Sequence, residues 1–328
     1  PDPDYAQVKV LKVGVCGSDM HLFHHGKIGD IEMTGPLVIG HEAMGVVTAV
    51  GHGVDASLVG ARVAIEPQYF CGRCRWCLAG NTNLCPNQHF LGLPPTDGAM
   101  QEYIAHPANL LERLGDSVSD EAAVAMEPMA VALHAVNLAK VRPPQTVVIL
   151  GVGVLGTCVM MLLGLYRGLR IVCVDILPDR LDRASSLGAS AVVYASGKDP
   201  GETVRDIIAS TPGHGADIVL ECCGESETLR SMCEVAAPGA HVIVIGTNPL
   251  DTVSFSSASA RRKGLTLRFV RRSLNTLAPC IELASAGLIH PGAIVTHTFA
   301  ASDVETAFKT VDTRSDGVLK ALIDMEKW

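Results

Sequence analysis

Short apolar runs separated by glycines recur through the middle of the chain. Residues 146–150 form a run typical of a parallel strand covered on both faces, and a glycine-rich turn and an apolar helical stretch at 157–165 follow it. Four more apolar strands are predicted, at 171–174, 217–220, 241–245 and 265–267. Strands separated in this way predict an α/β unit with a six-stranded, doubly wound parallel sheet.

The first third of the chain carries a different pattern. Residues 8–15 alternate apolar and polar side chains, residues 61–66 form another short strand, and glycines punctuate the segment between them. Short strands broken by glycine predict an irregular β-rich domain. Two further strands, at 296–299 and 318–322, follow the completed parallel sheet. We therefore expect a β-rich domain at 1–126, a parallel-sheet domain at 127–271, and a return to the first domain over 272–328.

The composition narrows the classes of partner. The 328 residues are 48% hydrophobic and 18% charged, and the net charge of −8 argues against a nucleic-acid partner. No apolar run is long enough to span a bilayer. The chain opens Pro1-Asp2-Pro3-Asp4 without the pattern of a secretion signal, and it carries 11 cysteines, which fits a reducing compartment. We expect a cytoplasmic protein that acts on a small molecule and binds neither nucleic acid nor membrane.

Four cysteines lie close together in a turn-rich segment. They form a C-x2-C-x2-C-x7-C run that consists of Cys71, Cys74, Cys77 and Cys85. Four thiolates at this spacing can converge on one tetrahedral zinc ion. The alternative is a pair of disulfides, which a secretory context would favour. The sequence favours a structural zinc lobe.

A glycine-rich turn follows the strand at 146–150. Gly151, Gly153 and Gly156 form G-x-G-x-x-G between a strand and a helix, and the next strand ends in Asp175. This context is the fingerprint of a dinucleotide site, in which the phosphates lie at the N-terminus of the helix. Asp175 would bind a ribose hydroxyl and repel a 2′-phosphate, so NAD is favoured over NADP, although the nearby Arg180 could also serve a phosphate.

Four scattered residues form a second candidate metal set, namely Cys16, His41, Glu42 and Glu127. A catalytic zinc site has three protein ligands and one open position. Each residue taken alone is weak support, because a single buried cysteine or histidine is more often structural.

The order of these motifs resembles that of the zinc-containing medium-chain dehydrogenase/reductases. The segment Gly40-His41-Glu42-x2-Gly45-x5-Gly51-x2-Val54 matches the zinc-alcohol-dehydrogenase pattern, and it lies between a Cys-Gly-Ser-Asp-x-His segment at 16–21 and the four-cysteine lobe. Within that family the chain is most similar to sorbitol, xylitol and related polyol dehydrogenases. Three features carry this similarity, namely the loop Gly26-Lys27-Ile28-Gly29-Asp30, the stretch Glu127-Pro128 with Val131 and His134, and Asp175 with Arg180.

The resemblance implies a Rossmann domain beside a GroES-like catalytic domain, with the active site in the cleft between them. It implies hydride transfer from a secondary alcohol of a polyol to NAD, giving a ketose, in a homotetramer or dimer. Cys16 and His41 would bind the catalytic zinc, with Glu42 or Glu127 as the remaining ligand. When Glu42 is the ligand, Glu127 would hold the zinc-bound water or the substrate.

The resemblance also assigns further residues. Ser18 would be the proton relay and His21 its exit to solvent, whereas Arg272 would contact polyol and cofactor. The residues expected at the cofactor are Gly151, Gly153, Leu155, Gly156, Asp175, Arg180, Ile245, Gly246, Thr247, Val270 and Arg271.

Two departures from the family pattern affect the substrate and the N-terminus. Leu22 and Ser273 stand where the polyol enzymes have tyrosines, so the particular polyol is open. Family members carry about two more strands before residue 8, so we expect an N-terminal truncation. Two alternatives remain: a threonine or butanediol dehydrogenase of the same superfamily, and a non-catalytic NAD(H)-binding protein.

Overall fold

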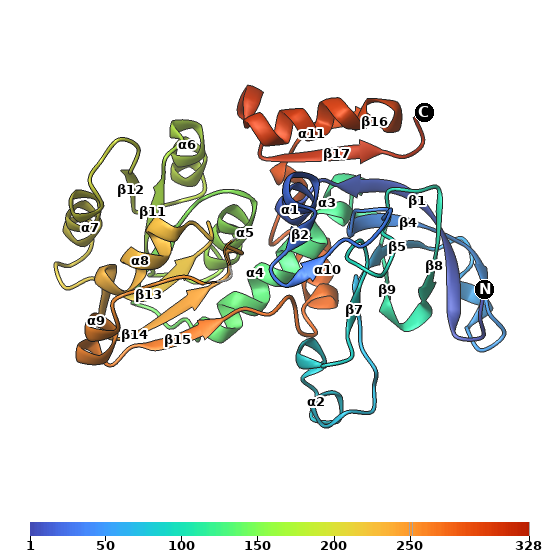
Figure 1. Cartoon of the computed structure of the whole chain (residues 1–328), viewed down its shortest axis with the longest axis horizontal. Helices are drawn as coiled ribbons and strands as arrows, with labels where there is room; N and C mark the ends of the chain where they lie inside the picture. Colours follow the sequence, from blue (N-terminus) through green and yellow to red (C-terminus); the bar gives the residue numbers. More distant parts are fainter. Residues whose placement is uncertain (249, 251, 328) are drawn as a thin grey trace. The chain divides into compact units, whose positions relative to one another are not determined.

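The computed structural model describes residues 1–248, 250 and 252–327. These residues form two compact units, one of 1–130 with the described residues from 274 onward and the other of the described residues within 131–273 (Figure 1). Each unit is built around its own sheet.

The first unit contains a mixed sheet that unites the two ends of the chain. Among the described residues it has seven strands in the order β16-β17-β1-β4-β5-β9, with β8 also paired to β1. The strands are β1 (Tyr5–Gly14), β4 (Glu42–Val50), β5 (Arg62–Ile65), β8 (Tyr103–Pro107), β9 (Leu111–Arg113), β16 (Val295–Ala300) and β17 (Lys320–Asp324). β17 pairs antiparallel with β1, with Gly14 opposite Leu322. The C-terminal segment therefore completes a sheet that begins at residue 5.

The alternation predicted for the first strand is present in β1. Val8, Val10 and Val13 are buried, and they pack in one cluster with Val47 of β4 and Ile323 of β17. Full burial of each valine contributes about 1.5–3 kcal/mol. These contacts hold together the strand ends from which the metal-site residues follow.

Short elements and helices surround this sheet (Figure 1). The short strands are β2 (Lys27–Ile28), β3 (Ile31–Glu32), β6 (Gln68–Tyr69) and β7 (His89–Phe90). The α-helices are α1 (Gly17–His25), α2 (Arg75–Leu78), α3 (Asp120–Val124), α10 (Leu277–Ser285) and α11 (Val304–Thr313). The 3-10 turns are η1 (Ala56–Leu58), η2 (Thr82–Leu84), η3 (Ala108–Leu110), η4 (Pro291–Ile294), η5 (Ala301–Asp303) and η6 (Ser315–Gly317). Helix α4 (Met126–Ala139) begins in the first unit and continues into the second.

The second unit is a doubly wound parallel sheet, as predicted. Its six described strands have the order β12-β11-β10-β13-β14-β15, which is the Rossmann order 3-2-1-4-5-6. The strands are β10 (Thr146–Leu150), β11 (Arg170–Asp175), β12 (Ala191–Tyr194), β13 (Ala216–Glu221), β14 (Ala236–Val244) and β15 (Thr266–Phe269). The helices are α5 (Val154–Leu163), α6 (Pro178–Ser186), α7 (Pro200–Ala209), α8 (Ser226–Val235) and α9 (Ser257–Lys263). Central strand β10 is buried along its whole length, which explains its unbroken apolar sequence.

The strand predictions omitted one member of this sheet. β12 lies at the edge, is four residues long, and exposes Val192 and Tyr194. A short half-exposed strand carries too weak an apolar signal to be recognised. Among the described residues, no helix has the length and apolar character needed to cross a bilayer.

Candidate metal centres and nucleotide site

The ends of two paired strands bring together Cys16, His41 and Glu42. Cys16 lies just after β1, whereas His41 directly precedes β4 and Glu42 begins it. Gly14 of β1 is opposite Glu42 in the antiparallel register, and a side chain at Gly14 would collide with the Glu42 carboxylate. One potential ligand atom from each of the three residues lies within 4.8 Å of the other two.

The orientation of the His41 ring is set by residues of α1. Its Nε2 lies 3.2 Å from Ser18 Oγ, and its Nδ1 lies 3.6 Å from Asp19 Oδ1. The fully buried Asp19 also accepts hydrogen bonds from the backbone N–H groups of Cys16 (2.8 Å) and Gly40 (3.3 Å). A carboxylate beside Nδ1 favours the tautomer with the proton there, which leaves the Nε2 lone pair for a metal.

Asp19 is a candidate functional residue that the sequence analysis missed. Burial raises its pKa, whereas His41 and the backbone N–H of Cys16 oppose that rise. Its place within the Cys-Gly-Ser-Asp segment was the available signal, but only the fold shows which ring the carboxylate faces.

Glu42 forms a buried ion pair with a lysine from the other end of the chain. Lys320 Nζ lies 2.7 Å from Oε1 and 2.5 Å from Oε2, and it donates a third hydrogen bond to the Val15 carbonyl (3.0 Å). Burial opposes the charge on Lys320, but Glu42 and Cys16 outweigh it and raise the pKa of the lysine. Lys320 was also missed at the sequence level.

Glu127 lies near Cys16, His41 and Glu42 but is not one of the residues whose potential ligand atoms meet. It lies in the first turn of α4 and is partly buried. Burial, reinforced by the Glu42 and Glu66 carboxylates and opposed by His41, raises its pKa to about 7. A carboxyl group with this pKa exchanges a proton readily near neutral pH.

The donor set fits a catalytic zinc ion. A thiolate, an imidazole and a carboxylate are all zinc ligands, and three of them leave the fourth position open. Burial and the Glu42 charge raise the pKa of the Cys16 thiol, so a bound cation is needed to hold Cys16 as a thiolate.

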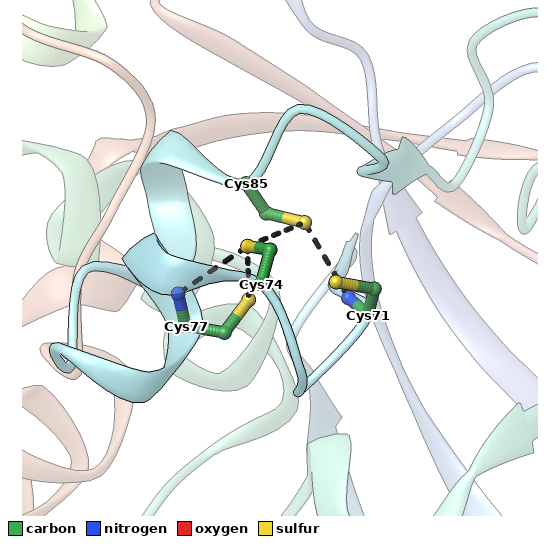
Figure 2. Close-up of side chains that lie close together, drawn as sticks. All are labelled: Cys71, Cys74, Cys77 and Cys85. Carbon is green, nitrogen blue, oxygen red and sulfur yellow. Dashed lines mark hydrogen bonds between the residues drawn. The ribbon is translucent and has the colours of Figure 1, made fainter.

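The four cysteines of the predicted lobe also converge (Figure 2). The Cys74 sulfur lies 3.4 Å from that of Cys77 and 3.9 Å from that of Cys85. A Zn–S distance of about 2.3 Å in a tetrahedron separates the sulfurs by about 3.8 Å. All four thiols are free in the described structure, so the geometry suits zinc rather than disulfides.

The backbone of the lobe supports thiolate character. The N–H groups of Cys71 and Cys77 point at the sulfurs of Cys85 and Cys74, each at 3.5 Å (Figure 2). The backbone N–H groups of Arg73 and Cys74 lower the pKa of Cys71 to about 6. Cys71 is therefore ready to bind a cation at neutral pH. Burial raises the pKa of Cys77 to about 12, so a bound cation is needed to hold that residue as a thiolate.

The glycine loop after β10 has the shape that a dinucleotide requires. Gly151 has φ of +90°, and a side chain at Gly156 would collide with the Gly151 carbonyl. Gly153 is the N-cap of α5 and offers no capping side chain, so the first N–H groups of the helix are available to an anion. The loop fits a pyrophosphate.

Asp175, at the end of β11, accepts a hydrogen bond from the glycine loop. Its Oδ2 accepts a hydrogen bond from Val152 N (2.8 Å), and its Oδ1 accepts from Ile176 N (2.8 Å) and Leu177 N (3.0 Å). Arg180 Nη1 lies 3.8 Å from Asp175 Oδ2 and 3.3 Å from the position that a Gly153 Cβ would occupy. Arg180 therefore lies over the loop, beside the acid.

Comparison with known proteins assigns the family. Residues 2–116 match the alcohol dehydrogenase GroES-like domain, and residues 154–286 match the zinc-binding dehydrogenase family. The chain belongs to the zinc-binding alcohol dehydrogenases. The predicted resemblance is thereby confirmed, as are zinc and a nicotinamide dinucleotide as the cofactors of this dehydrogenase.

Individual relatives of the dehydrogenase cover nearly all of it. An L-idonate 5-dehydrogenase from Vitis vinifera is 35% identical over 98% of this chain and 88% of its own length. A sorbitol dehydrogenase from Arabidopsis thaliana is 33% identical over 98% of this chain and 89% of its own. The crystal structure of an Escherichia coli CFT073 alcohol dehydrogenase complexed with NADH has a TM-score of 0.90 and 28% identity, covering 99% of this chain and 93% of that one.

The remaining predicted site residues of the dehydrogenase are distributed as follows. His21 lies on α1 with its ring stacked against His25 at 6.3 Å between centroids. Arg272 has a left-handed φ of +53°. Leu155 lies in the first turn of α5, Ile245, Gly246 and Thr247 follow β14, and Val270 and Arg271 follow β15. Their roles toward cofactor and substrate stay predictions.

Proposed function

We propose that this protein is an NAD-dependent polyol dehydrogenase that oxidises a secondary alcohol to a ketone, giving a ketose. The observation that carries the proposal is the meeting of Cys16, His41 and Glu42, with Ser18 Oγ 3.2 Å from His41 Nε2. Relatives named for idonate and sorbitol support a polyhydroxylated substrate.

Ser18 is the residue best placed to take up the hydroxyl proton. When bound by Cys16, His41 and Glu42, zinc supplies the Lewis acidity that makes a nearby hydroxyl easier to deprotonate. Ser18 then accepts the proton and passes it toward His21, three residues on along α1, which releases it to solvent. General acid–base help of this kind contributes about 10²–10⁴-fold to the rate.

Glu127 holds the substrate hydroxyl by a hydrogen bond rather than as a permanent metal ligand. This assignment follows from its place outside the close group and from its pKa of about 7. A carboxyl group accepts a hydrogen bond from a hydroxyl, and in its protonated form it also donates one.

Asp175 supports NAD rather than NADP as the acceptor. The carboxylate lies at the end of β11 beside the glycine loop, where it would repel a 2′-phosphate. Arg180, which lies over the same loop, assists in holding the ribose.

We also propose that the enzyme works in the cytoplasm as a homotetramer or dimer. The 11 cysteines, all free in the described structure, suit a reducing compartment. Light scattering on the purified protein gives the mass of the assembly, and a monomer would contradict the second part of this proposal.

The decisive experiment is NADH formation with sorbitol, xylitol, ribitol, threonine and butanediol, with and without a zinc chelator. We expect chelator-sensitive turnover of polyols. Cys16→Ser should abolish it, and His21→Ala should cost far less, because the relay has a route to bulk water. Zinc-loaded protein that binds NADH tightly but turns over none of these compounds would instead be a binding protein.

A butanediol dehydrogenase is the second candidate, and one observation favours it. Leu22, Phe90 and Leu93 form a small buried apolar cluster, and the Phe90 ring lies 5.3 Å from the His41 ring. Apolar side chains beside the metal site leave substrate hydroxyls without partners. A kcat/KM for butanediol above those for the polyols would select this candidate.

A further inference from the structure

Glu221 is a buried acid that neither metal site uses. It ends β13 and has no exposed surface. Its Oε1 accepts three hydrogen bonds, from Cys223 N (3.0 Å), Gly224 N (2.8 Å) and Thr228 Oγ1 (2.8 Å). Its Oε2 is equally buried and has no hydrogen-bond partner among the described residues. Such burial costs free energy that an apolar residue would avoid, and it raises the pKa of the group.

The hydrogen bonds of the Glu221 side chain go to the loop that follows β13, and this loop contacts the glycine loop after β10. Cys222 N donates to the Leu150 carbonyl (2.8 Å), and the Cys223 thiol donates to the same carbonyl (3.2 Å). A side chain at Gly151 would collide with the Cys223 sulfur. The position of Cys223 therefore constrains the turn that would receive the pyrophosphate.

The same loop also contacts the segment after β14. Ile245 N (2.8 Å) and Gly246 N (3.1 Å) both donate to the Glu221 carbonyl. A side chain at Gly246 would collide with Gly224 N, and one at Gly224, which has φ of +73°, would collide with Thr247. The loops after β10, β13 and β14 thus meet around Glu221.

We infer that Glu221 is a positioning residue for the dinucleotide site, because it fixes the loop that holds the segments after β10 and β14 in register. This inference rests on the proposed use of NAD(H). Ligands of doubly wound sheets bind outside the carboxyl ends of the strands, and Glu221 lies at that edge. The side chain acts through Cys223 and Gly224 and is assigned no contact with the cofactor.

The test is NADH binding by fluorescence titration of the zinc-loaded protein, well below the midpoint of thermal unfolding. Glu221→Ala removes the acceptor and should raise the Kd for NADH at least about tenfold, since two backbone N–H groups lose their buried partner. Glu221→Gln keeps one acceptor oxygen and should stay within about threefold of the wild type. Glu234→Ala is the matched control, because this α8 carboxylate accepts only from Ser259 Oγ of α9 (3.1 Å) among the described partners and has no hydrogen bond to the three loops among them.

Two further readouts separate positioning from general stability. With saturating NAD, kcat of Glu221→Ala should fall less than about threefold while KM for NAD follows the Kd. Hydrogen exchange without cofactor should accelerate at 222–225 and 245–248 and stay unchanged in β10 and β11. A Kd equal to that of the wild type, or a Glu221→Gln variant as weak as Glu221→Ala, would overturn the inference and leave the proposed function intact. Wild-type protein that fails to bind NADH would overturn the proposed function itself.

Discussion

Lys320 Nζ contacts both carboxylate oxygens of Glu42, and both side chains are almost fully buried. The ion pair places a positive charge against the carboxylate of Glu42, which is one of the three residues that would bind zinc. It compensates a buried carboxylate in the absence of metal, and it leaves that carboxylate with less negative charge to offer a cation.

Removal of this lysine should destabilise the metal-free protein most. Lys320→Met leaves the Glu42 charge unpaired, which costs about 3–5 kcal/mol when one partner of a buried pair is lost. Bound zinc would supply the missing positive charge, so the loss should be smaller in the metal-loaded protein. Urea unfolding with and without chelator measures the loss of stability in the metal-free and in the metal-loaded protein. Lys309→Met, which breaks an exposed pair with Glu305, should cost less than about 1 kcal/mol. Equal losses in the two metal states would contradict the proposed ligand role of Glu42.

The four-cysteine lobe should hold one of two zinc ions per chain. Cys74→Ser removes the sulfur that lies within 3.9 Å of two others, so zinc content should fall by one equivalent and the thermal midpoint should drop. Metal analysis of the purified variant gives the answer. Cys280→Ala is the control, because this buried thiol lies on α10 outside both groups, and its zinc content should equal that of the wild type.

His106 should make stability depend on pH. Its Nδ1 lies 2.8 Å from the Tyr69 hydroxyl, which donates to it, and its Nε2 donates to the Glu66 carbonyl at 3.0 Å. Burial lowers the pKa of His106 to about 4, whereas an unfolded histidine titrates near 6.5.

The neutral ring is therefore favoured in the folded state, and the unfolded state binds more protons between pH 6.5 and 4. The stabilisation is complete above pH 6.5 and is lost as the pH falls through that window, by about 3 kcal/mol in total. Unfolding free energies measured across this range should show the slope, and His106→Gln should flatten it. The exposed His52→Gln variant should keep the pH dependence of the unfolding free energy. If the same slope persists undiminished in His106→Gln, His106 is not its origin.

Asp175 should set the preference between the two nicotinamide cofactors. Asp175→Gly removes the charge that repels a 2′-phosphate, together with the acceptor for Val152 N. We expect kcat/KM to fall for NAD much more than for NADP. Asp175→Asn, which removes the charge while keeping an amide oxygen, should change the ratio in the same direction with a smaller loss for NAD. Proportional losses for both cofactors would mean that Asp175 only supports the loop.

Local sequence patterns predicted most of the fold because the central strands are apolar along their whole length. The glycine loop and the apolar run at 146–150 determine their own conformations, so β10 and its turn were recognisable. β12 was not, since half of its side chains face solvent. The fold class, the family and the cofactors were predicted correctly from several independent motifs in one order.

The residues that the sequence analysis missed depend on distant pairing. Lys320 is 278 positions from Glu42, and nothing around it differs from an ordinary strand residue. Its role follows only from the pairing of β17 with β1 and of β1 with β4. Asp19 is near Cys16 in sequence, but its effect on His41 requires the packed orientation of α1.

The strand order of the first unit also has a consequence for biosynthesis. Glu42 is synthesised before the parallel-sheet unit, whereas its lysine partner lies on β17, after that entire unit. A nascent chain that buried the Glu42 carboxylate early would hold it without a counter-charge until β17 emerged. Pairing of Glu42 with Lys320 beside the candidate metal site therefore waits until β17 has emerged, when the parallel-sheet unit can already have folded.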